Sequence, residues 1–200
     1  MSIVIFLNGC GSSGKTVIAK SIQHLSDAPW LRLGMDMLID MIPERYIAFG
    51  DKAREGYFSF VPGHNDRGPT MHVEMTPKGS DLFGLMPSFA KVLADQGNQL
   101  IIDEVLFGDD ILKAYGQALL AHTTYFVGVF CDLPKMQERE ILRGDRAIGL
   151  SNDQLDRVHT DIKYDLKIDT TRLTPFEAAK QILDFVAEVS EPQALKTMCK

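Results

Sequence analysis

The chain has few cysteines, no long apolar run and no excess of positive charge. Its three cysteines, Cys10, Cys131 and Cys199, are odd in number and scattered, which argues against a disulfide framework and favours a reducing compartment. The net charge of −6 gives no overall field that would attract nucleic acid or an anionic membrane. No stretch is apolar and long enough to span a membrane, and the apolar residues 3–7 are too short for a signal peptide. We therefore expect a cytoplasmic protein whose partner is neither nucleic acid nor membrane.

The sequence also lacks internal repeats, low-complexity segments and histidines at metal-ligand spacing. Hydrophobic residues make up 45% of the chain and charged residues 24%, which is an ordinary globular composition. A length of 200 residues suits one domain with a sizeable core. We expect residues 1–200 to form a single domain.

Apolar runs alternate with segments of helical spacing along most of the chain. Strands are expected, in chain order, at 3–7, 31–34, 99–103, 123–131 and 164–169. Helices are expected at 15–25, 36–42, 80–97, 109–121 and 174 to about 189. Capping boxes are expected at Ser151-x-x-Gln154 and at Thr174-Pro175-Phe176-Glu177. Buried strands separated by helices predict a three-layer α/β fold with a mainly parallel sheet covered on both faces.

Residues 44–78 do not fit this alternation. The segment is rich in glycine and proline, and residues 57–61 and 71–75 alternate like two exposed strands. We expect an irregular excursion from the core, with a hairpin over the functional site. Loops of this length in compact domains are usually functional or mobile.

The stretch after the first expected strand has the form Gly9-x-x-x-x-Gly14-Lys15-Thr16. Small residues let backbone N–H groups surround a phosphate, lysine reaches the outer phosphates, and the neighbouring hydroxyl coordinates Mg²⁺. A strand before the loop and a helix after it favour a true phosphate loop over a chance glycine-rich turn. The expected nucleotide-binding residues are Gly9, Cys10, Gly11, Ser12, Ser13, Gly14, Lys15 and Thr16. Cys10 is either a reactive thiol or a small filler, and filling is the favoured interpretation.

Two acidic positions follow expected strands. Asp36 comes just after residues 31–34, where it either accepts a proton from a substrate hydroxyl or caps the next helix. A structural role is favoured for Asp40, one helical turn further on. In Asp103-Glu104 we favour Asp103 as the Mg²⁺-side carboxylate, while Glu104 could instead face the acceptor.

Arg139, Arg143 and Arg146 cluster around a helix end that Gly144 breaks. They form either a lid over a nucleotide, at residues 139–150, or a solvated helix face, and we favour the lid because guanidinium groups suit phosphate oxygens. The loop after the last strand can border a purine. Asp169, Thr170 and Arg172 are candidates there, although turn chemistry explains them about as well.

Five stretches of the chain, in order, resemble the chloramphenicol phosphotransferase family of small-molecule kinases. They are "FLNGCGSSGKT", "PWLRLGMDMLID", "LIIDEVL", "VGVFCDLPKMQEREILRGDR" and "YDLKIDTT". The resemblance implies a P-loop kinase-like fold, the cofactors ATP and Mg²⁺, and phosphorylation of a hydroxyl on an antibiotic. It implies that Asp36 is the general base and that Arg143 and Arg146 belong to a lid.

Residues 44–84 lie outside the resemblance, and this region is expected to shape the acceptor pocket. The leading hypothesis is an ATP-dependent O-phosphotransferase acting on a small-molecule alcohol. Lys15, Asp36, Arg143 and Arg146 would be its catalytic residues, Arg139 and Thr170 would contact the nucleotide, and Thr16 and Asp103 would hold the metal. A kinase of a nucleotide sugar, like the zeta-type toxins, or of another metabolite is the second hypothesis. A nucleotide-dependent switch without transfer is the third.

Overall fold

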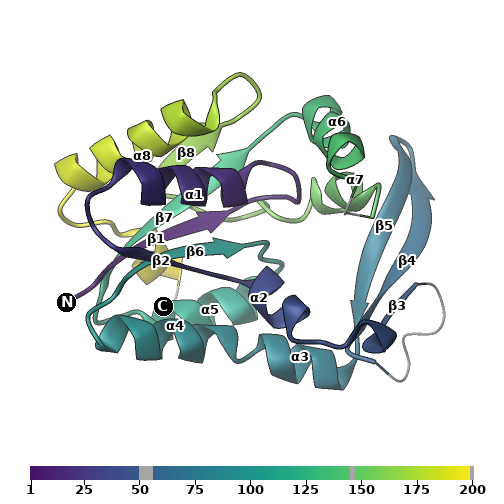
Figure 1. The fold of residues 1–200 in the computed structure, drawn as a ribbon, viewed down its shortest axis with the longest axis horizontal. Helices are drawn as coiled ribbons and strands as arrows, with labels where there is room; N and C mark the ends of the chain where they lie inside the picture. Colours follow the sequence, from purple (N-terminus) through teal and green to yellow (C-terminus); the bar gives the residue numbers. More distant parts are fainter. Residues whose placement is uncertain (50–55, 145–146, 199–200) are drawn as a thin grey trace.

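The structure is a computed structural model, and it describes residues 1–49, 56–144 and 147–198 (Figure 1). Its central sheet has five strands in the order β2-β6-β1-β7-β8, and all four neighbouring pairs are parallel. The strands are β1 (Ile3–Asn8), β2 (Trp30–Gly34), β6 (Gln99–Glu104), β7 (Thr123–Phe130) and β8 (Leu166–Asp169). The sheet order reverses at β1, so the loop after β1 lies where parallel sheets open a ligand crevice.

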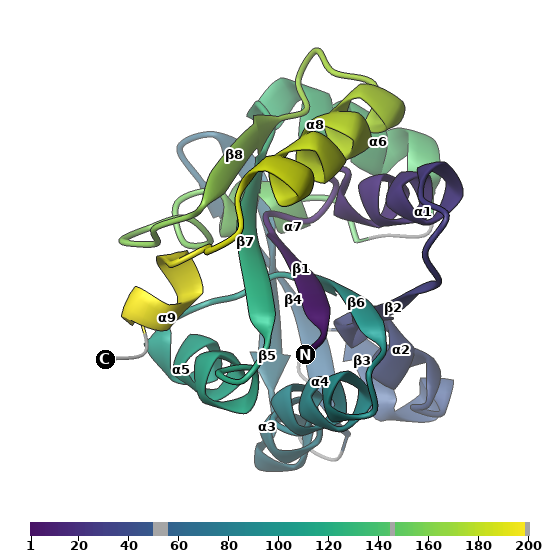
Figure 2. The same cartoon turned by 90° about the vertical axis from the view of Figure 1, so that its left-hand side faces the viewer.

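Helices cover both faces of the central sheet. Figure 2 shows α1 (Lys15–Leu25) and α8 (Pro175–Glu188) on one face, where they pack against each other. On the other face lie α4 (Met86–Asp95), α5 (Asp109–Ala118) and α9 (Ala194–Met198). The predicted three-layer α/β architecture is confirmed.

Alternate side chains of β1 enter the two cores. Val4 and Phe6 pack on the α4 and α5 side, whereas Ile5 and Leu7 pack on the α1 and α8 side, and all four are 0% exposed. Trp30, the only tryptophan of the chain, lies in the second core and donates its indole N–H to Ser26 Oγ at 3.0 Å. Because β1 is buried on both faces, the loop that follows it starts from a rigid support.

The excursion is more regular than the sequence predicts. After a 3₁₀ turn, η1 (Glu44–Tyr46), it contains a second sheet made of β3 (Ile47–Phe49), β4 (Phe58–Asn65) and β5 (Gly68–Met75). The two predicted strands are present but longer, as an antiparallel hairpin that turns at residues 66–67. Among the described residues, β3 pairs with residues 58–60 of β4 in parallel. In Figure 1 this hairpin stands beside α6 (Leu133–Arg143) and α7 (Leu150–Gln154).

One predicted helix differs from the structure for local reasons. The helix expected over 80–97 is two helices, α3 (Pro77–Phe83) and α4, separated at Gly84 and Leu85. Pro87 lies in the first turn of α4, where its missing N–H is tolerated and where it favours a new helix start. The first helix also begins earlier than predicted, because Thr76 Oγ1 caps it by accepting the N–H of Gly79 at 3.1 Å.

One of the two predicted capping boxes is present. Thr174 and Glu177 form the reciprocal pair that begins α8. The prediction at Ser151 and Gln154 is wrong, because α7 begins after Gly149 in a left-handed conformation with φ 98°. Ser151 is therefore inside the helix, and Gln154 bonds elsewhere.

Among the residues that the structure describes, no helix combines the length and apolar character needed to cross a membrane. Cys10 and Cys131 are both free thiols. Cys199 lies outside the described residues.

Candidate active site

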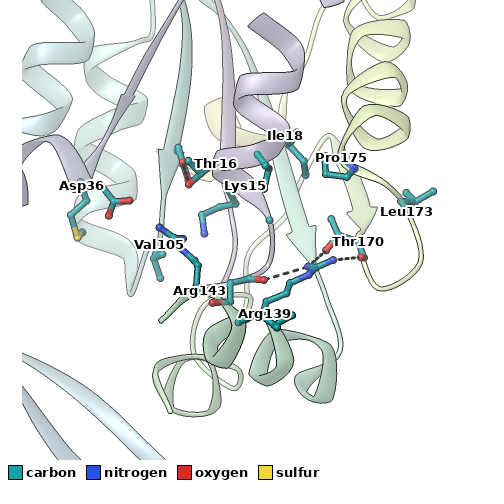
Figure 3. A pocket seen from close by; sticks show the side chains of 16 residues that line it. Lys15, Thr16, Ile18, Asp36, Val105, Arg139, Arg143, Thr170, Leu173 and Pro175 are labelled. Atoms are coloured by element: carbon teal, nitrogen blue, oxygen red, sulfur yellow. Dashed lines mark hydrogen bonds between the residues drawn. The ribbon is translucent and has the colours of Figure 1, made fainter. Parts of the chain in front are cut away.

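A cavity of about 380 Å³ opens at the carboxyl end of the central sheet (Figure 3). It extends from Asp36 on α2 (Met35–Asp40), past the loop after β1, to Leu173 and Pro175 at the start of α8. Its lining residues are Ser12, Gly14, Lys15, Thr16, Val17, Ile18, Met35, Asp36, Asp103, Val105, Arg139, Leu142, Arg143, Thr170, Leu173 and Pro175. Most of the residues predicted from the sequence to be functional therefore meet in one space.

The loop from Gly9 to Gly14 has a backbone that requires small residues. Gly14 has φ 100°, and Ser12 has φ 62°, which is uncommon for a residue other than glycine. A Cβ on Gly9 would lie 2.3 Å from the carbonyl oxygen of Val129, so β7 leaves no room for a side chain. The hydroxyls of Ser12 and Ser13 are buried, and neither has a hydrogen-bond partner among residues 1–49, 56–144 and 147–198. The observed loop has the strand-before, helix-after setting that the motif predicts.

Lys15 folds back over this loop. Its side chain is 6% exposed, and Nζ donates to the carbonyl oxygens of Gly9 and Cys10, at 2.9 Å each. These bonds hold the ammonium group at the cavity wall, so a strong cationic donor is in place where the loop opens.

Thr16 and Asp103 meet at the floor of the cavity. Thr16 Oγ1 donates to Asp103 Oδ2 at 2.7 Å, and Arg32 Nη1 lies 3.7 Å from the same oxygen. A Cβ on Gly34 would lie 2.5 Å from the Asp103 carbonyl oxygen, so the ends of β2 and β6 approach closely. A hydroxyl and a carboxylate are oxygen ligands of the kind that Mg²⁺ prefers.

Asp36 is exposed and lines the cavity at its far end from α8 (Figure 3). The helix cap at this end of α2 is Gly34, so Asp36 is the second residue of the helix and not its cap. Asp40, one turn further on, is exposed and lies outside the cavity lining.

Glu104 points into the opposite layer from Asp103. It is 2% exposed, outside the cavity lining, and accepts a hydrogen bond from the Tyr115 hydroxyl at 2.9 Å. Burial raises the pKa of Glu104 to about 8, and the neighbouring Asp103 carboxylate adds to the shift. The position of Glu104 therefore does not support the alternative in which it faces the acceptor.

Arg139 and Thr170 support the phosphate loop through hydrogen bonds to its backbone. Arg139 donates to the carbonyl oxygens of Ser12 and Ser13 at 3.3 Å each and to that of Thr170 at 2.8 Å. Thr170 Oγ1 donates to the Ser13 carbonyl oxygen at 2.6 Å. Both residues line the cavity, and Arg139 also donates to Thr170 Oγ1 at 3.2 Å, so the pair supports the loop.

Arg143 ends α6, lines the cavity and lies beside Lys15 in Figure 3. Gly144 follows in a left-handed conformation with φ 68°. Glu140, one turn earlier, is 1% exposed and accepts the N–H groups of Gly149 at 3.0 Å and Ser151 at 2.7 Å. Arg146 lies outside the described residues.

Sequence reasoning missed the apolar half of this cavity. Met35, Val105 and Leu142 lie among its lining residues, and so do Leu173 and Pro175. An apolar residue near the end of a helix or strand has no feature in the sequence that separates a cavity wall from a core position. The Gly–Lys–Thr loop was recognisable, in contrast, because each of its residue types has a distinct role.

A family model for chloramphenicol phosphotransferase-like proteins matches residues 2–187. The chain belongs to this family. A Mycobacterium tuberculosis protein, named as a candidate O-phosphotransferase, is 25% identical over 199 residues, covering 98% of this chain and 88% of that protein. The chain described in this structure is therefore a phosphotransferase enzyme.

Solved structures of small-molecule kinases share its fold. A sugar kinase from Janibacter has a TM-score of 0.59 and 14% identity, covering 94% of this chain and 95% of that one. The Mycobacterium tuberculosis APS kinase, in complex with AMPPNP and APS, has a TM-score of 0.55 and 13% identity, covering 94% and 98%. At such identities the likeness shows the fold, which is that of the P-loop kinases.

Proposed function

We propose that this protein transfers the terminal phosphoryl group of ATP to a hydroxyl group of a small molecule. The observation that carries the proposal is the shared cavity, in which Asp36 faces the same space as Lys15, Thr16 and Arg143. A nucleotide switch needs the loop, but it does not need a carboxylate at the far end of the cavity. Family membership and the kinase fold support the same reaction class.

ATP would lie with its phosphates against the loop and its base towards α8. Lys15 would exchange its present backbone partners for phosphate oxygens. Leu173 and Pro175 offer apolar surface at the opposite end from Asp36, which suits a purine ring. Arg139 and Thr170 would hold the loop for the nucleotide, and through it they would contribute to binding.

Thr16 and Asp103 fit a magnesium ion. Their oxygens already lie 2.7 Å apart at the cavity floor, and a hard cation with few protein ligands completes its shell with water and phosphate oxygens. Bound there, the ion would neutralise charge on the phosphates during transfer.

Asp36 would accept the proton of the attacking hydroxyl. Arg143 would stabilise the charge of the phosphoryl group as it moves, together with Arg146. Holding the hydroxyl and the nucleotide in one cavity supplies positioning, which accounts for much of the rate in phosphoryl transfer.

The acceptor is a hydroxyl compound with an apolar body. Met35 and Val105 line the cavity together with Asp36, so an acceptor there would meet apolar surface beside the charged groups. Chloramphenicol is one such compound, and the family name supports testing it first.

A panel of acceptors would test the proposal. The protein with Mg²⁺ and ATP is incubated with chloramphenicol, other hydroxyl-bearing antibiotics, simple sugars and nucleotide sugars, and each is examined for added phosphate by mass spectrometry. We expect phosphorylation of an apolar alcohol. Phosphorylation of nucleotide sugars alone would favour the second hypothesis, and slow ATP hydrolysis that no acceptor stimulates would favour a switch.

Replacing Asp36 tests the chemistry directly. Asp36→Asn should lower kcat by about 10²–10⁴-fold, the usual contribution of a general base, while ATP binding is retained. Asp40→Asn is the matched control, because it makes the same change one turn further along α2, outside the cavity. Full transfer activity in Asp36→Asn would remove Asp36 from the role of base.

A further inference from the structure

Helix α7 is short, yet it buries polar side chains between the phosphate loop and the hairpin. Ser151 and Asn152 are 0% exposed and Gln154 is 7% exposed. Side chains of this kind are seldom buried without a specific partner. The partner of Gln154 is the phosphate loop, and the partner of Asn152 is the hairpin of β4 and β5. The Ser151 hydroxyl has no hydrogen-bond partner within the described part of the chain.

The contact with the phosphate loop is made by Gln154. Its Oε1 accepts the N–H of Gly11 at 2.6 Å, in a buried bond between residues 143 positions apart. Gly11 N–H and the carbonyl of Cys10 belong to the same peptide group, and that carbonyl accepts Nζ of Lys15 at 2.9 Å. Because a peptide group is planar, Gln154 fixes the direction of the oxygen that holds the lysine.

The contact with the hairpin is made at the other end of α7. Asn152 Nδ2 donates to the carbonyl oxygen of Pro69 at 2.9 Å, and the N–H of Met71 donates to that of Gly149 at 3.1 Å. A Cβ on Gly149 would lie 2.9 Å from the Pro69 oxygen, so hairpin and helix touch closely. Arg67, in the turn of the hairpin, donates to Asn152 Oδ1 at 3.0 Å.

We propose that Gln154 is a positioning residue that sets the phosphate loop and couples it to the hairpin. The Gln154 amide orients the Cys10–Gly11 peptide and, through it, Lys15. The hairpin in turn holds α7 in place, so a change in the hairpin alters nucleotide affinity. This inference rests on the proposed function only in that it requires a nucleotide at the loop.

Replacing the amide group tests this role. Gln154→Met keeps the length of the side chain and removes the acceptor, so the buried Gly11 N–H loses its partner; we expect the Kd for ATP to rise roughly tenfold. Gln154→Asn is too short to reach Gly11 and should give a similar loss, which provides a second variant if the first fails to fold. Gln154→Glu keeps an acceptor oxygen at the same distance and should recover part of the affinity. Gln181→Met, on the exposed surface of α8, is the matched control.

The coupling is tested by a double-mutant cycle in ATP Kd with Asn152→Ala and Gln154→Met. The two changes should combine less than additively, because both act through α7. Binding is measured by calorimetry on protein shown to be folded by circular dichroism, so a purely structural defect is separated from a binding defect.

Wild-type ATP affinity in both Gln154→Met and Gln154→Asn would overturn the positioning role, and strictly additive effects would overturn the coupling. These outcomes do not depend on the acceptor. A protein that binds ATP less tightly without Gln154, yet phosphorylates no compound, would contradict the proposed function and leave this inference standing.

Discussion

Cys10 lies within the phosphate loop, and its side chain is buried. It is 2% exposed and packs against Met136 and Val158. Burial raises the pKa of its thiol to about 11, although the nearby Lys15 ammonium acts in the opposite direction. The interpretation of Cys10 as a small filler is the one the structure favours.

The reactivity of Cys10 should follow this pKa. Only the thiolate reacts with iodoacetamide, and a raised pKa means that the thiolate is scarce at pH 8 and increases as the pH approaches 11. We expect slow alkylation of the native protein at pH 8 and fast alkylation in denaturant, measured on the peptide that contains Cys10. Equal rates in the two conditions would show that the thiol is reactive in the folded loop.

At the residue scale, the sequence predicts the location of those side chains whose chemical type has one specific role in a motif. Lys15, Thr16 and Asp103 lie together as the motif and strand positions suggest. The partners of Arg139 were not predictable, because its bonds to Ser12 and Thr170 cross from α6 to two distant loops. Such contacts depend on tertiary placement, and no local pattern records them.

At the element scale, α6 and α7 are joined by one buried carboxylate. Both oxygens of Glu140 accept backbone N–H groups at the start of α7, which is where the chain re-enters the core after Gly144. Charge-assisted hydrogen bonds of this kind are stronger than neutral ones. They fix α6, which carries Arg139 and Arg143, relative to α7, which contacts the hairpin.

Glu140→Gln should therefore be destabilising. The amide offers one acceptor where the carboxylate offers two, so a buried N–H loses its partner and the free energy of unfolding should fall by about 1–3 kcal/mol. Denaturant unfolding measures the change. Glu138→Gln makes the same replacement on the exposed face of α6 and should change stability by less than about 0.5 kcal/mol. Equal effects of the two variants would contradict a special role for Glu140.

Helices and strands with a clear period were predictable, and their interruptions were not. The strand at 3–7 and the capping box at Thr174 are read from local chemistry alone. The helix breaks at Gly84 because Pro87 favours a new helix start. The capping box predicted at Ser151 is absent because the Gln154 side chain is hydrogen-bonded to the phosphate loop. Alternation predicts the two strands of the hairpin, but their length depends on cross-strand pairing, which the sequence pattern does not give.

At the scale of the whole molecule, the cavity joins α2, the phosphate loop, α6 and the start of α8. A ligand in this cavity would contact segments that are far apart in the sequence. Binding to the folded state alone raises its stability by mass action.

Nucleotide should consequently stabilise the whole protein, and Lys15 should be required for this. At a ligand concentration of about 100 times Kd, we expect Mg²⁺ and ATP to raise Tm by roughly 5–10 °C. Lys15→Ala should lose most of this shift, because phosphate loses its cationic partner. Lys20→Ala, an exposed position of the same helix, should retain it. Differential scanning fluorimetry provides the measurement, and an undiminished shift in Lys15→Ala would argue against the loop as the nucleotide site.

Trp30 gives this molecule a built-in optical probe. It is the only indole in the chain, it is 6% exposed, and it begins the strand whose other end leads to Asp36. Because its ring is packed in the α1 and α8 core rather than in the cavity, its emission arises from a single environment that persists as long as that layer is folded. The fluorescence of Trp30 will therefore report whether the layer formed by α1 and α8 is folded.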